Sequence, residues 1–378
     1  MTINNEHKKL NVPNLRFPEF EGEWEESTIG EMFDLYSGNT PSRLNKEHFK
    51  GTVNWISSGE LKEHYIYSSK EQISEEAAKS LKLLPVGTFV IAIYGLEAEG
   101  VRGTGSITQE PSTISQACMS FIPKGVIENE FLYSWYKKHG NVIGIRYAQG
   151  TKQQNLSYDI LEKFRIVYPK TKEQEKLNKL ISLLDERIST QNKIIDKLQS
   201  LIKGIAQKIV RNNKPNVRLA ECLECKSSTL QESEVCEQGT YPVYGANGIV
   251  GYLDNYSTEG EAVYIIKDGS GVGTVSYVTG KCSATGTLNT LQAKEGYSLQ
   301  YFYYLLKVFN FEPYKTGMAI PHIYFKDYGK AKVFCPSYTE QLQYARLLYA
   351  IESKLSIEKK ILTSLSLQKQ YLLRQMFI

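Results

Sequence analysis

Polar side chains in several loops of the first half carry the donors and acceptors that recognition of a base edge requires. A side-chain amide offers a donor and an acceptor side by side, so a run of amides can make paired hydrogen bonds to adenine. An arginine in the glycine-rich segment EGVRGTGS could contact guanine or a phosphate in the same way. The candidate residues of this half are Thr40, Ser42, Arg43, Arg102, Lys152, Gln153, Gln154 and Asn155.

The second half offers loops of similar character at corresponding places. When the sequence is shifted by 167 positions, His322 falls on Asn155, which favours a shared role for these two residues. Each single residue could instead be a surface loop residue that contacts only water. The candidates of this half are Tyr244, Asn247, Lys267, Ser270, Lys315, Thr316, Ile320 and His322.

Patterns for catalysis or phosphate binding are missing from the sequence. None of the 12 prolines precedes an aspartate, and no G-x-x-x-x-G-K-[ST], G-x-G-x-x-G or G-x-S-x-G string occurs. The five histidines include no pair spaced four apart, as a zinc-binding helix requires. The glycine-rich segment 269–273 lies between two strand-like runs, which favours a hairpin turn. We therefore expect no catalytic residue and disfavour a free-standing enzyme.

Three cysteines are the only group that invites a test for zinc. Cys222 and Cys225 have the spacing of a ligand pair and Cys236 follows, but no second close pair completes a tetrahedral site. Reduced thiols are favoured over zinc. We expect neither a metal nor a cofactor in this chain.

Two long amphipathic segments must position the candidate loops. Segments 172–212 and 339–378 each follow a proline and contain no other proline. Apolar residues recur in both every 3.5 residues on average, the spacing of a coiled-coil seam. In the first segment, the two seam positions hold Ile181, Ile188, Ile195, Ile202 and Ile209, and Leu177, Leu184, Gln191, Leu198 and Ile205. In the second, they hold Leu348, Leu355, Leu362 and Met376, and Tyr344, Ile351, Leu365 and Leu372.

Polar residues interrupt the seam at Gln191, Glu358 and Lys369. Gln191 and Glu358 lie near the midpoints of their segments, where they could set the register of an antiparallel pair. They could equally mark a bend or a solvent-exposed point. Segment 170–214 holds eleven Lys and Arg against five Asp and Glu, a charge that could attract phosphate or simply belong to a solvated helix face.

The chain repeats itself around these segments. A shift of 167 positions aligns Pro169 with Pro336 and the Glu-Gln pair at 173–174 with the pair at 340–341. Each half combines an apolar β-type run (87–95, 260–269) with a short aromatic-rich helix (131–136, 301–306). We predict an α+β protein with two mixed α/β domains, 1–168 and 213–335, followed by long helices at 169–212 and 336–378.

The order of these four parts predicts their arrangement. A helix of about 40 residues spans roughly 60 Å, so the second domain should lie near its far end. The second helix then has to run back antiparallel to the first, with pseudo-two-fold symmetry. If the two helices do not pair, each is instead a core helix of a bundle.

Composition limits the class of protein only broadly. The chain has 378 residues, of which 41% are hydrophobic and 23% charged, and a net charge of +4, which permits a polyanionic partner without requiring one. The six cysteines are too scattered for a disulfide framework, residues 1–9 are polar, and no apolar run is long enough for a membrane span. We expect a cytoplasmic protein that does not interact with membranes.

Taken together, the sequence resembles the specificity subunit of Type I restriction-modification systems over almost its whole length. The resemblance rests on the two long helices, the string WEESTIGEMFDLYSGNTPS, the string YPVYGANGIVGY and the PxxxEQ that closes each half. It implies two target-recognition domains that read an asymmetric, bipartite sequence in double-stranded DNA. It also implies helices that act as spacer and docking surface for modification (methyltransferase) and restriction (motor-nuclease) subunits, to which S-adenosylmethionine, ATP and Mg²⁺ belong.

A coiled-coil adapter that joins two proteins without touching nucleic acid remains the main alternative. It would share both helices, but it gives no reason for polar loops at matching positions in the two domains.

Overall fold

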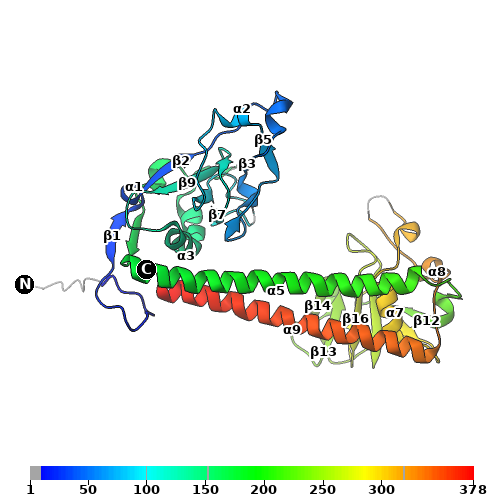
Figure 1. The fold of residues 1–378 in the computed structure, drawn as a ribbon. Coiled ribbons are helices and arrows are strands. Elements are labelled where there is room, and N and C mark those ends of the chain that lie inside the picture. The colour runs from blue at the N-terminus through cyan, green and yellow to red at the C-terminus, as the bar shows by residue number, and fades with distance from the viewer. Residues whose placement is uncertain (1–9, 99, 151–152, 318–319) are drawn as a thin grey trace, which may run out of the picture. The chain divides into compact units, whose positions relative to one another are not determined.

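Two compact units make up the computed structural model, which describes residues 10–98, 100–150, 153–317 and 320–378 (Figure 1). The first unit comprises residues 1–191 and 361–378, and the second comprises residues 192–360. Each unit combines β-sheets with parts of both long helices. The expected α+β class, with two sheet-containing domains and two long helices that pack together, is confirmed.

The first domain is built on a five-stranded sheet of order β2-β9-β6-β7-β4, in which only β7 and β4 are parallel neighbours. A three-stranded sheet β5-β3-β8 and the pair β1-β10 complete it. Its strands are β1 (Glu25–Thr28), β2 (Phe33–Ser37), β3 (Val53–Ile56), β4 (Tyr65–Ile66), β5 (Glu71–Ile73), β6 (Phe89–Ala92), β7 (Gly105–Thr108), β8 (Ser112–Ile114), β9 (Cys118–Pro123) and β10 (Arg165–Tyr168). Its helices are α1 (Ile29–Met32), α2 (Glu75–Ala78), α3 (Asn129–Tyr147), α4 (Tyr158–Leu161) and the 3₁₀ turns η1 (Lys46–Phe49) and η2 (Ser58–Glu60).

The second domain repeats this plan. Its antiparallel sheet β12-β18-β15-β16 has the strand order of β2-β9-β6-β7, and its pair β11-β19 matches β1-β10. Its strands are β11 (Val217–Arg218), β12 (Leu223–Ser227), β13 (Tyr241–Gly245), β14 (Gly248–Leu253), β15 (Glu261–Ile266), β16 (Val275–Thr279), β17 (Ser283–Ala284), β18 (Leu288–Ala293) and β19 (Lys332–Val333). Its helices are α6 (Leu219–Cys222), α7 (Leu299–Leu306), α8 (Phe325–Tyr328) and the 3₁₀ turns η3 (Glu232–Glu234) and η4 (Glu312–Tyr314).

Both expected aromatic-rich segments are helices, but they differ in length. In the second domain α7 has 8 residues, as the prediction of a short helix requires, whereas α3 in the first domain has 19. The prediction of a short helix was therefore wrong for α3. Residues 137–147 contain no proline, and the buried Ile143 gives the extension a hydrophobic anchor, so the helix continues.

The long helices are α5 (Thr171–Arg211) and α9 (Tyr338–Met376), whose ends lie within two residues of the predicted segments. In the first unit, Leu177 and Ile181 of α5 share a buried core with Leu373 and Met376 of α9. In the same unit Lys369 pairs with Asp185. Residue numbers along α9 therefore decrease in the direction in which residue numbers along α5 increase. The two helices therefore run antiparallel there. Lys369, a break in the apolar pattern, is a paired charge in the structure.

In the second unit, the other ends of the helices meet. Ala206 and Ile209 of α5 lie beside Leu348 of α9 and Tyr304 of α7 around one small cavity. Gln191 is buried, while the idea that Gln191 and Glu358 set the register stays a prediction. A capping box between Ser337 and Glu340 starts α9, in which the Glu340 carboxylate accepts from Ser337 N at 3.1 Å.

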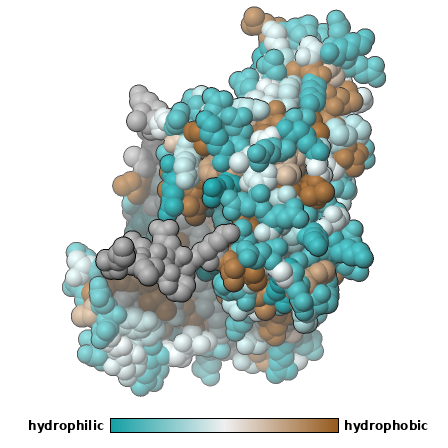
Figure 2. Space-filling model, turned by 90° about the vertical axis from the view of Figure 1, so that its left-hand side faces the viewer, coloured by the Kyte–Doolittle hydropathy of each residue, from teal (hydrophilic) through white to brown (hydrophobic). Residues whose placement is uncertain are grey.

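Hydrophobic residues fill the interior of each unit, and some also reach the surface. Figure 2 shows hydrophobic residues in small groups among more numerous hydrophilic ones. Within the described part of the chain, no helix has the length and apolarity that crossing a bilayer would demand.

Candidate DNA interface

Two loops whose ends are joined by the same backbone bridge occupy equivalent places in the two domains. In loop 149–155, Gln149 N donates to Asn155 O at 2.8 Å and Asn155 N donates to Gln149 O at 2.9 Å. In loop 316–322, Thr316 N donates to His322 O at 2.9 Å and His322 N donates to Thr316 O at 2.7 Å. The bridging residues of one loop lie 167 positions after those of the other, as the sequence repeat predicts. We call these the bridged loops.

A glycine follows the first bridging residue in each loop, and the geometry requires it. Gly150 has φ of +107° and Gly317 has φ of +88°, a backbone conformation that L-residues with a side chain rarely adopt. A Cβ atom would lie 2.1 Å from Gln153 O in the first loop and 2.3 Å from Ile320 O in the second. Glycine is therefore required at positions 150 and 317.

Each bridged loop is held against the end of an equivalent strand. Leu156 N donates to Ile93 O at 2.9 Å just after β6, and Ile323 N donates to Lys267 O at 2.9 Å just after β15. Because β6 and β15 have the same place in their sheets, each domain presents its loop at the same sheet end.

Side chains of the first bridged loop are braced by the segment that follows β6. Gln153 Oε1 accepts a hydrogen bond from Tyr94 Oη at 2.7 Å, and Gln154 Oε1 accepts from Arg102 Nη2 at 2.8 Å. Glu97 Oε2 accepts from the backbone N of Gln154 at 2.8 Å, and this bond lowers the pKa of the Glu97 carboxyl. Arg102, Gln153 and Gln154 thus form one polar surface. Hydrogen bonds from Tyr94 and Arg102 orient the two glutamine amides.

Arg102 reaches this surface because α3 leaves room for it. A Cβ atom at Gly144 of α3 would lie 2.5 Å from Arg102 Cγ, so the arginine stem lies directly over that glycine. Its Nε atom is buried and has no acceptor among the described residues. The guanidinium donates to Gln154 through Nη2, and this bond holds it beside the amides of the loop.

The second bridged loop carries different side chains on the same backbone bridge. His322 Nδ1 lies 2.6 Å from Asp268 Oδ1, and the imidazole stacks at 6.5 Å on Tyr324. Thr316 and Ile320 are exposed at the loop surface. Lys267 supplies the carbonyl that holds the loop, and Ser270 is exposed in the turn between β15 and β16. That turn confirms the hairpin expected for glycines 269–273.

Other predicted residues lie apart from the bridged loops or are already engaged. The Arg43 guanidinium makes two 2.8 Å bonds to Glu71 and lies 4.4 Å from the centroid of the Phe49 ring. Lys315 Nζ pairs with Glu312 at 2.5 Å. No hydrogen bond joins Arg43 or Lys315 to a bridged loop within the described ranges. Thr40 and Ser42 lie in the same segment as Arg43, and Lys152 lies outside the described residues.

Tyr244 and Asn247 belong to the hairpin of β13 and β14. Asn247 is exposed in its two-residue turn, whereas the Tyr244 ring packs 5.6 Å from the Tyr264 ring. Burial raises the pKa of Tyr244. Tyr244 is therefore partly a packing residue, and Asn247 is the freer of the two.

Tyr94 and Asp268 are functional candidates that sequence reasoning missed. Each bonds a predicted recognition residue, and each directly precedes the glycine that ends an apolar strand run. That shared place before Gly95 and Gly269 was the available signal.

The cysteines do not gather into a metal site. All six are free, and the described residues contain no group of three or more His, Cys, Asp or Glu able to hold a metal ion. The Cys222 thiol donates to Arg218 O at 3.6 Å, and interaction with Cys222 lowers the pKa of Cys335.

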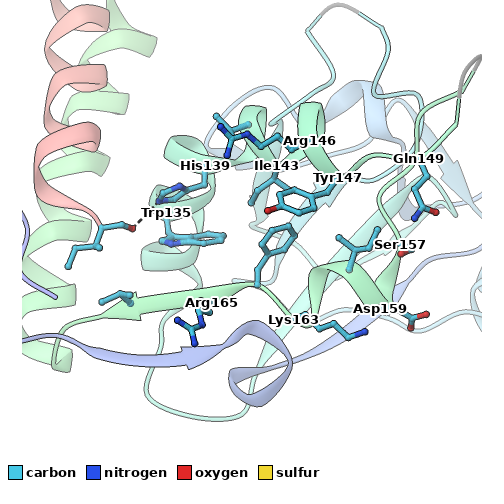
Figure 3. Close-up of a pocket in the computed structure, with 15 residues that line it drawn as sticks. Trp135, His139, Ile143, Arg146, Tyr147, Gln149, Ser157, Asp159, Lys163 and Arg165 are labelled. Carbon is cyan, nitrogen blue, oxygen red and sulfur yellow. Dashed lines mark hydrogen bonds between the residues drawn. The ribbon is translucent and has the colours of Figure 1, made fainter. Parts of the chain in front are cut away.

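A surface hollow of about 940 Å³ in the first unit places a serine, a histidine and an aspartate on one lining. Figure 3 shows His139 beside Trp135, while Ser157 and Asp159 lie toward the opposite end. His139 Nε2 bonds to Ile378 O at 2.9 Å, and burial lowers the pKa of this imidazole. A nucleophile needs a base within hydrogen-bond reach, and His139 and Ser157 make no such bond.

Comparison with known proteins decides the family. A family model described as the Type I restriction modification DNA specificity domain matches residues 21–200 and 213–367. The chain belongs to this family. The two matches cover the two sequence repeats, so each carries one specificity domain with its bridged loop and most of its long helix.

Two curated relatives carry the same description. The chain is 29% identical over 185 residues to the Type I restriction enzyme MjaIX specificity subunit of Methanocaldococcus jannaschii, an alignment covering 47% of this chain and 42% of the relative. It is 31% identical over 189 residues to the EcoR124I/EcoR124II specificity subunit of Escherichia coli, covering 49% of this chain and 45% of the relative. The chain thus spans just under half the length of these relatives.

A solved structure shares the fold over almost the whole chain. The S subunit of a Type I restriction-modification system from M. genitalium superposes with a TM-score of 0.68 at 19% identity, covering 97% of this chain and 99% of that one. The fold of a specificity subunit, with two sheet domains and two packed helices, is therefore the fold of this chain.

Proposed function

We propose that this chain is the DNA-reading, non-catalytic specificity subunit of a Type I restriction-modification complex. Each domain reads one part of a bipartite, asymmetric sequence in double-stranded DNA. The observation that carries the proposal is the pair of bridged loops, which share a backbone frame but not their side chains. Two loops with the same backbone bridge but different side chains suit a protein that reads two different half-sites.

The side chains of each loop suggest what it reads. In the first domain, Gln153, Gln154 and Asn155 offer amides for paired bonds to adenine, and Arg102 suits guanine or a phosphate. In the second domain, Thr316 and His322 supply a hydroxyl and an imidazole instead. The two half-sites should therefore differ in sequence.

Further candidates complete the proposed interface. Arg43 and Lys315 can reach phosphate only by exchanging Glu71 and Glu312 for DNA, which makes them backbone contacts rather than base readers. The residues we assign to the interface beside those already named are Thr40, Ser42, Lys152, Tyr244, Asn247, Lys267, Ser270 and Ile320.

The long helices are proposed to dock the modification and restriction subunits. In support, large apolar side chains stay exposed along them, and exposed apolar surface often marks a protein interface. They are Leu183, Leu367 and Tyr371 in the first unit and Leu201, Leu347, Tyr349 and Ile357 in the second. S-adenosylmethionine, ATP and Mg²⁺ would be used by those partner subunits, and the complex would act on DNA in the cytoplasm.

The test is the set of methylated sequences in cells that express the chain with its modification subunit. Wild type should methylate one bipartite sequence. The triple variant Gln153→Ala, Gln154→Ala, Asn155→Ala should relax base preference in one half-site only. The double variant Thr316→Ala, His322→Ala should relax it in the other.

The exposed helix residue Gln368 offers the matched control, because Gln368→Ala should leave both half-sites unchanged. DNA binding by the complex should also weaken steeply with salt, because phosphate contacts release counterions. A complex that assembles but binds DNA without sequence preference would refute this proposal. A complex that assembles but does not bind DNA would favour the adapter alternative.

A further inference from the structure

In the second unit, one carboxylate of the long helix α9 holds the aromatic helix α7. Glu352 accepts hydrogen bonds from Tyr303 Oη at 3.0 Å, from Tyr304 Oη at 2.7 Å and from Lys307 Nζ at 2.8 Å. The Lys307 ammonium also lies 4.8 Å from the centroid of the Tyr303 ring. Two donors from α7 and one from Lys307, which caps its C-terminus, thus converge on a single carboxylate.

In the first unit, the carboxylate of Asp185 on the long helix α5 makes the corresponding contacts. Asp185 Oδ2 lies 3.0 Å from Nδ1 of the buried His64, and His64 Nε2 lies 2.8 Å from Glu130 Oε2 of α3. Lys369 of α9 pairs with Asp185 as well. The imidazole is sandwiched between the rings of Tyr65 at 4.1 Å and Tyr133 of α3 at 3.9 Å. The domain, α3 and both long helices therefore meet at Asp185.

The two carboxylates are equivalent by position. Asp185 and Glu352 lie 167 residues apart, the shift that superposes the two long helices in sequence. On the aromatic helices, Tyr133 and Tyr303 correspond, as do the lysines that follow each by four residues. Lys137 lies 5.1 Å from the Tyr133 ring centroid, much as Lys307 lies over Tyr303. We call the two clusters the first joint and the second joint.

Both joints are charged although they are largely buried. Burial would raise the pKa of Glu352, but its bonds to Lys307 and Tyr304 outweigh burial and lower that pKa. Burial and the charge of Lys369 lower the pKa of Lys137 to about 8. A buried ion pair often stabilises no better than well-packed apolar residues would. The three hydrogen bonds on Glu352, and the close contacts of the His64 ring with Asp185, Tyr65 and Tyr133, nevertheless admit only a narrow range of orientations, which indicates a positioning role.

A protein that recognises two half-sites needs each recognition domain to be held at a fixed orientation. One added base pair moves a half-site by about 3.4 Å along the duplex and rotates it by roughly 34°. A domain that could tilt on its helix would follow that shift, and the complex would then accept several spacer lengths.

We propose that Asp185 and Glu352 are positioning residues that hold each specificity domain at a set angle on its long helix and thereby fix the spacer length that the complex accepts. This inference rests on the proposed function. It assigns no base contact to either residue, so weakening a joint should widen the accepted spacing and leave the bases read in each half-site unchanged.

The experiment compares methylated sequences for wild type, Asp185→Asn and Glu352→Gln, each expressed with the modification subunit. In the variants, sites with a spacer one base pair longer or shorter should gain about tenfold in methylated fraction, since a charge-assisted bond has been lost. Tyr304→Phe keeps the ring and removes one bond to Glu352, so it gives a milder version of the same change if Glu352→Gln does not fold. Urea unfolding reports which variants fold.

Glu186→Gln is the matched control, since Glu186 is the exposed neighbour of Asp185 on α5. It should keep the wild-type spacer pattern. Folded joint variants that methylate only the wild-type spacer would overturn the inference, as would variants that change the bases read. A wild-type complex that methylates no bipartite sequence would instead overturn the proposed function.

Discussion

Gln174 and Gln341 make the same two hydrogen bonds in the two halves of the chain. Gln174 Nε2 donates to Pro169 O at 2.8 Å and its Oε1 accepts from Glu128 N at 3.0 Å, just before α3. Gln341 Nε2 donates to Pro336 O at 2.9 Å and its Oε1 accepts from Ser298 N at 2.9 Å, just before α7. Both amides are buried. The glutamine of PxxxEQ therefore ties the start of each long helix to the start of each aromatic helix.

Replacing either glutamine should destabilise its own half of the chain. Gln174→Ala or Gln341→Ala leaves a buried N–H and a buried carbonyl without partners, so each should lower the free energy of unfolding by about 1–3 kcal/mol. Urea unfolding measures the change. Gln368→Ala, on the exposed face of α9, should stay within about 0.5 kcal/mol of wild type. Equal effects of the buried and exposed replacements would contradict the assigned contacts.

The glycines of the bridged loops should be essential for recognition but not for the fold. Gly150→Ala and Gly317→Ala place a Cβ atom against a carbonyl oxygen and force a strained φ, at a local cost of about 1–3 kcal/mol. Each should relax base preference in one half-site of the methylated sequence, while the domain still folds.

Gly204 of α5 provides the opposite control for those glycines. A Cβ atom there meets nothing within 4 Å. Gly204→Ala should therefore raise the free energy of unfolding by about 0.5–1 kcal/mol, because alanine favours helix, and should leave both half-sites unchanged. Loss of recognition in Gly204→Ala, or its retention in Gly150→Ala, would count against the loop assignment.

Periodicity and the internal repeat allowed much of the fold to be predicted. Heptad spacing predicts α5 and α9 to within two residues, and the 167-residue shift pairs Asn155 with His322, which form the equivalent bridges. Both signals are carried by residues close in sequence or by direct repetition.

Contacts between residues distant in sequence could not be predicted in this way. His64 and Asp185 are 121 residues apart, and no local pattern indicates that a histidine in a loop will meet a helix carboxylate. For the same reason the sequence shows Lys369 only as a break in the seam, since its partner Asp185 lies on the other helix. Tyr94 and Asp268 were missed because their partners lie in the bridged loops, more than fifty positions later.

The buried His64 and the partly buried His139 of the first unit should give opposite pH dependences. The carboxylates of Asp185 and Glu130 outweigh burial and raise the pKa of His64 in the folded chain. Above the unfolded value of about 6.5, the folded state then holds more protons, so the stability that His64 contributes falls as pH rises. Burial lowers the pKa of His139. Below about 6.5 the unfolded state holds more protons, and the contribution of His139 rises with pH.

Urea unfolding across pH 5.5 to 8.5 of wild type, His64→Gln and His139→Gln separates these contributions. The difference between wild type and His64→Gln should shrink as pH increases through neutrality and beyond. The difference between wild type and His139→Gln should grow as pH increases toward about 6.5. A difference for His64→Gln that does not change with pH would show that its carboxylate contacts are not kept in solution.

Tyr94 and Asp268 should each affect one half-site by orienting a neighbour. Tyr94→Phe keeps the ring and removes only the 2.7 Å bond to Gln153 Oε1, so it should weaken reading of the first half-site by up to about tenfold, the worth of one hydrogen bond. Asp268→Ala frees the imidazole of His322 and should act on the second half-site alone. Methylated fractions at single-base variants of each half-site give the measurement. Tyr67→Phe, on an exposed tyrosine, serves as control. If Tyr94→Phe altered the second half-site, or both half-sites equally, Tyr94 would not be acting through Gln153.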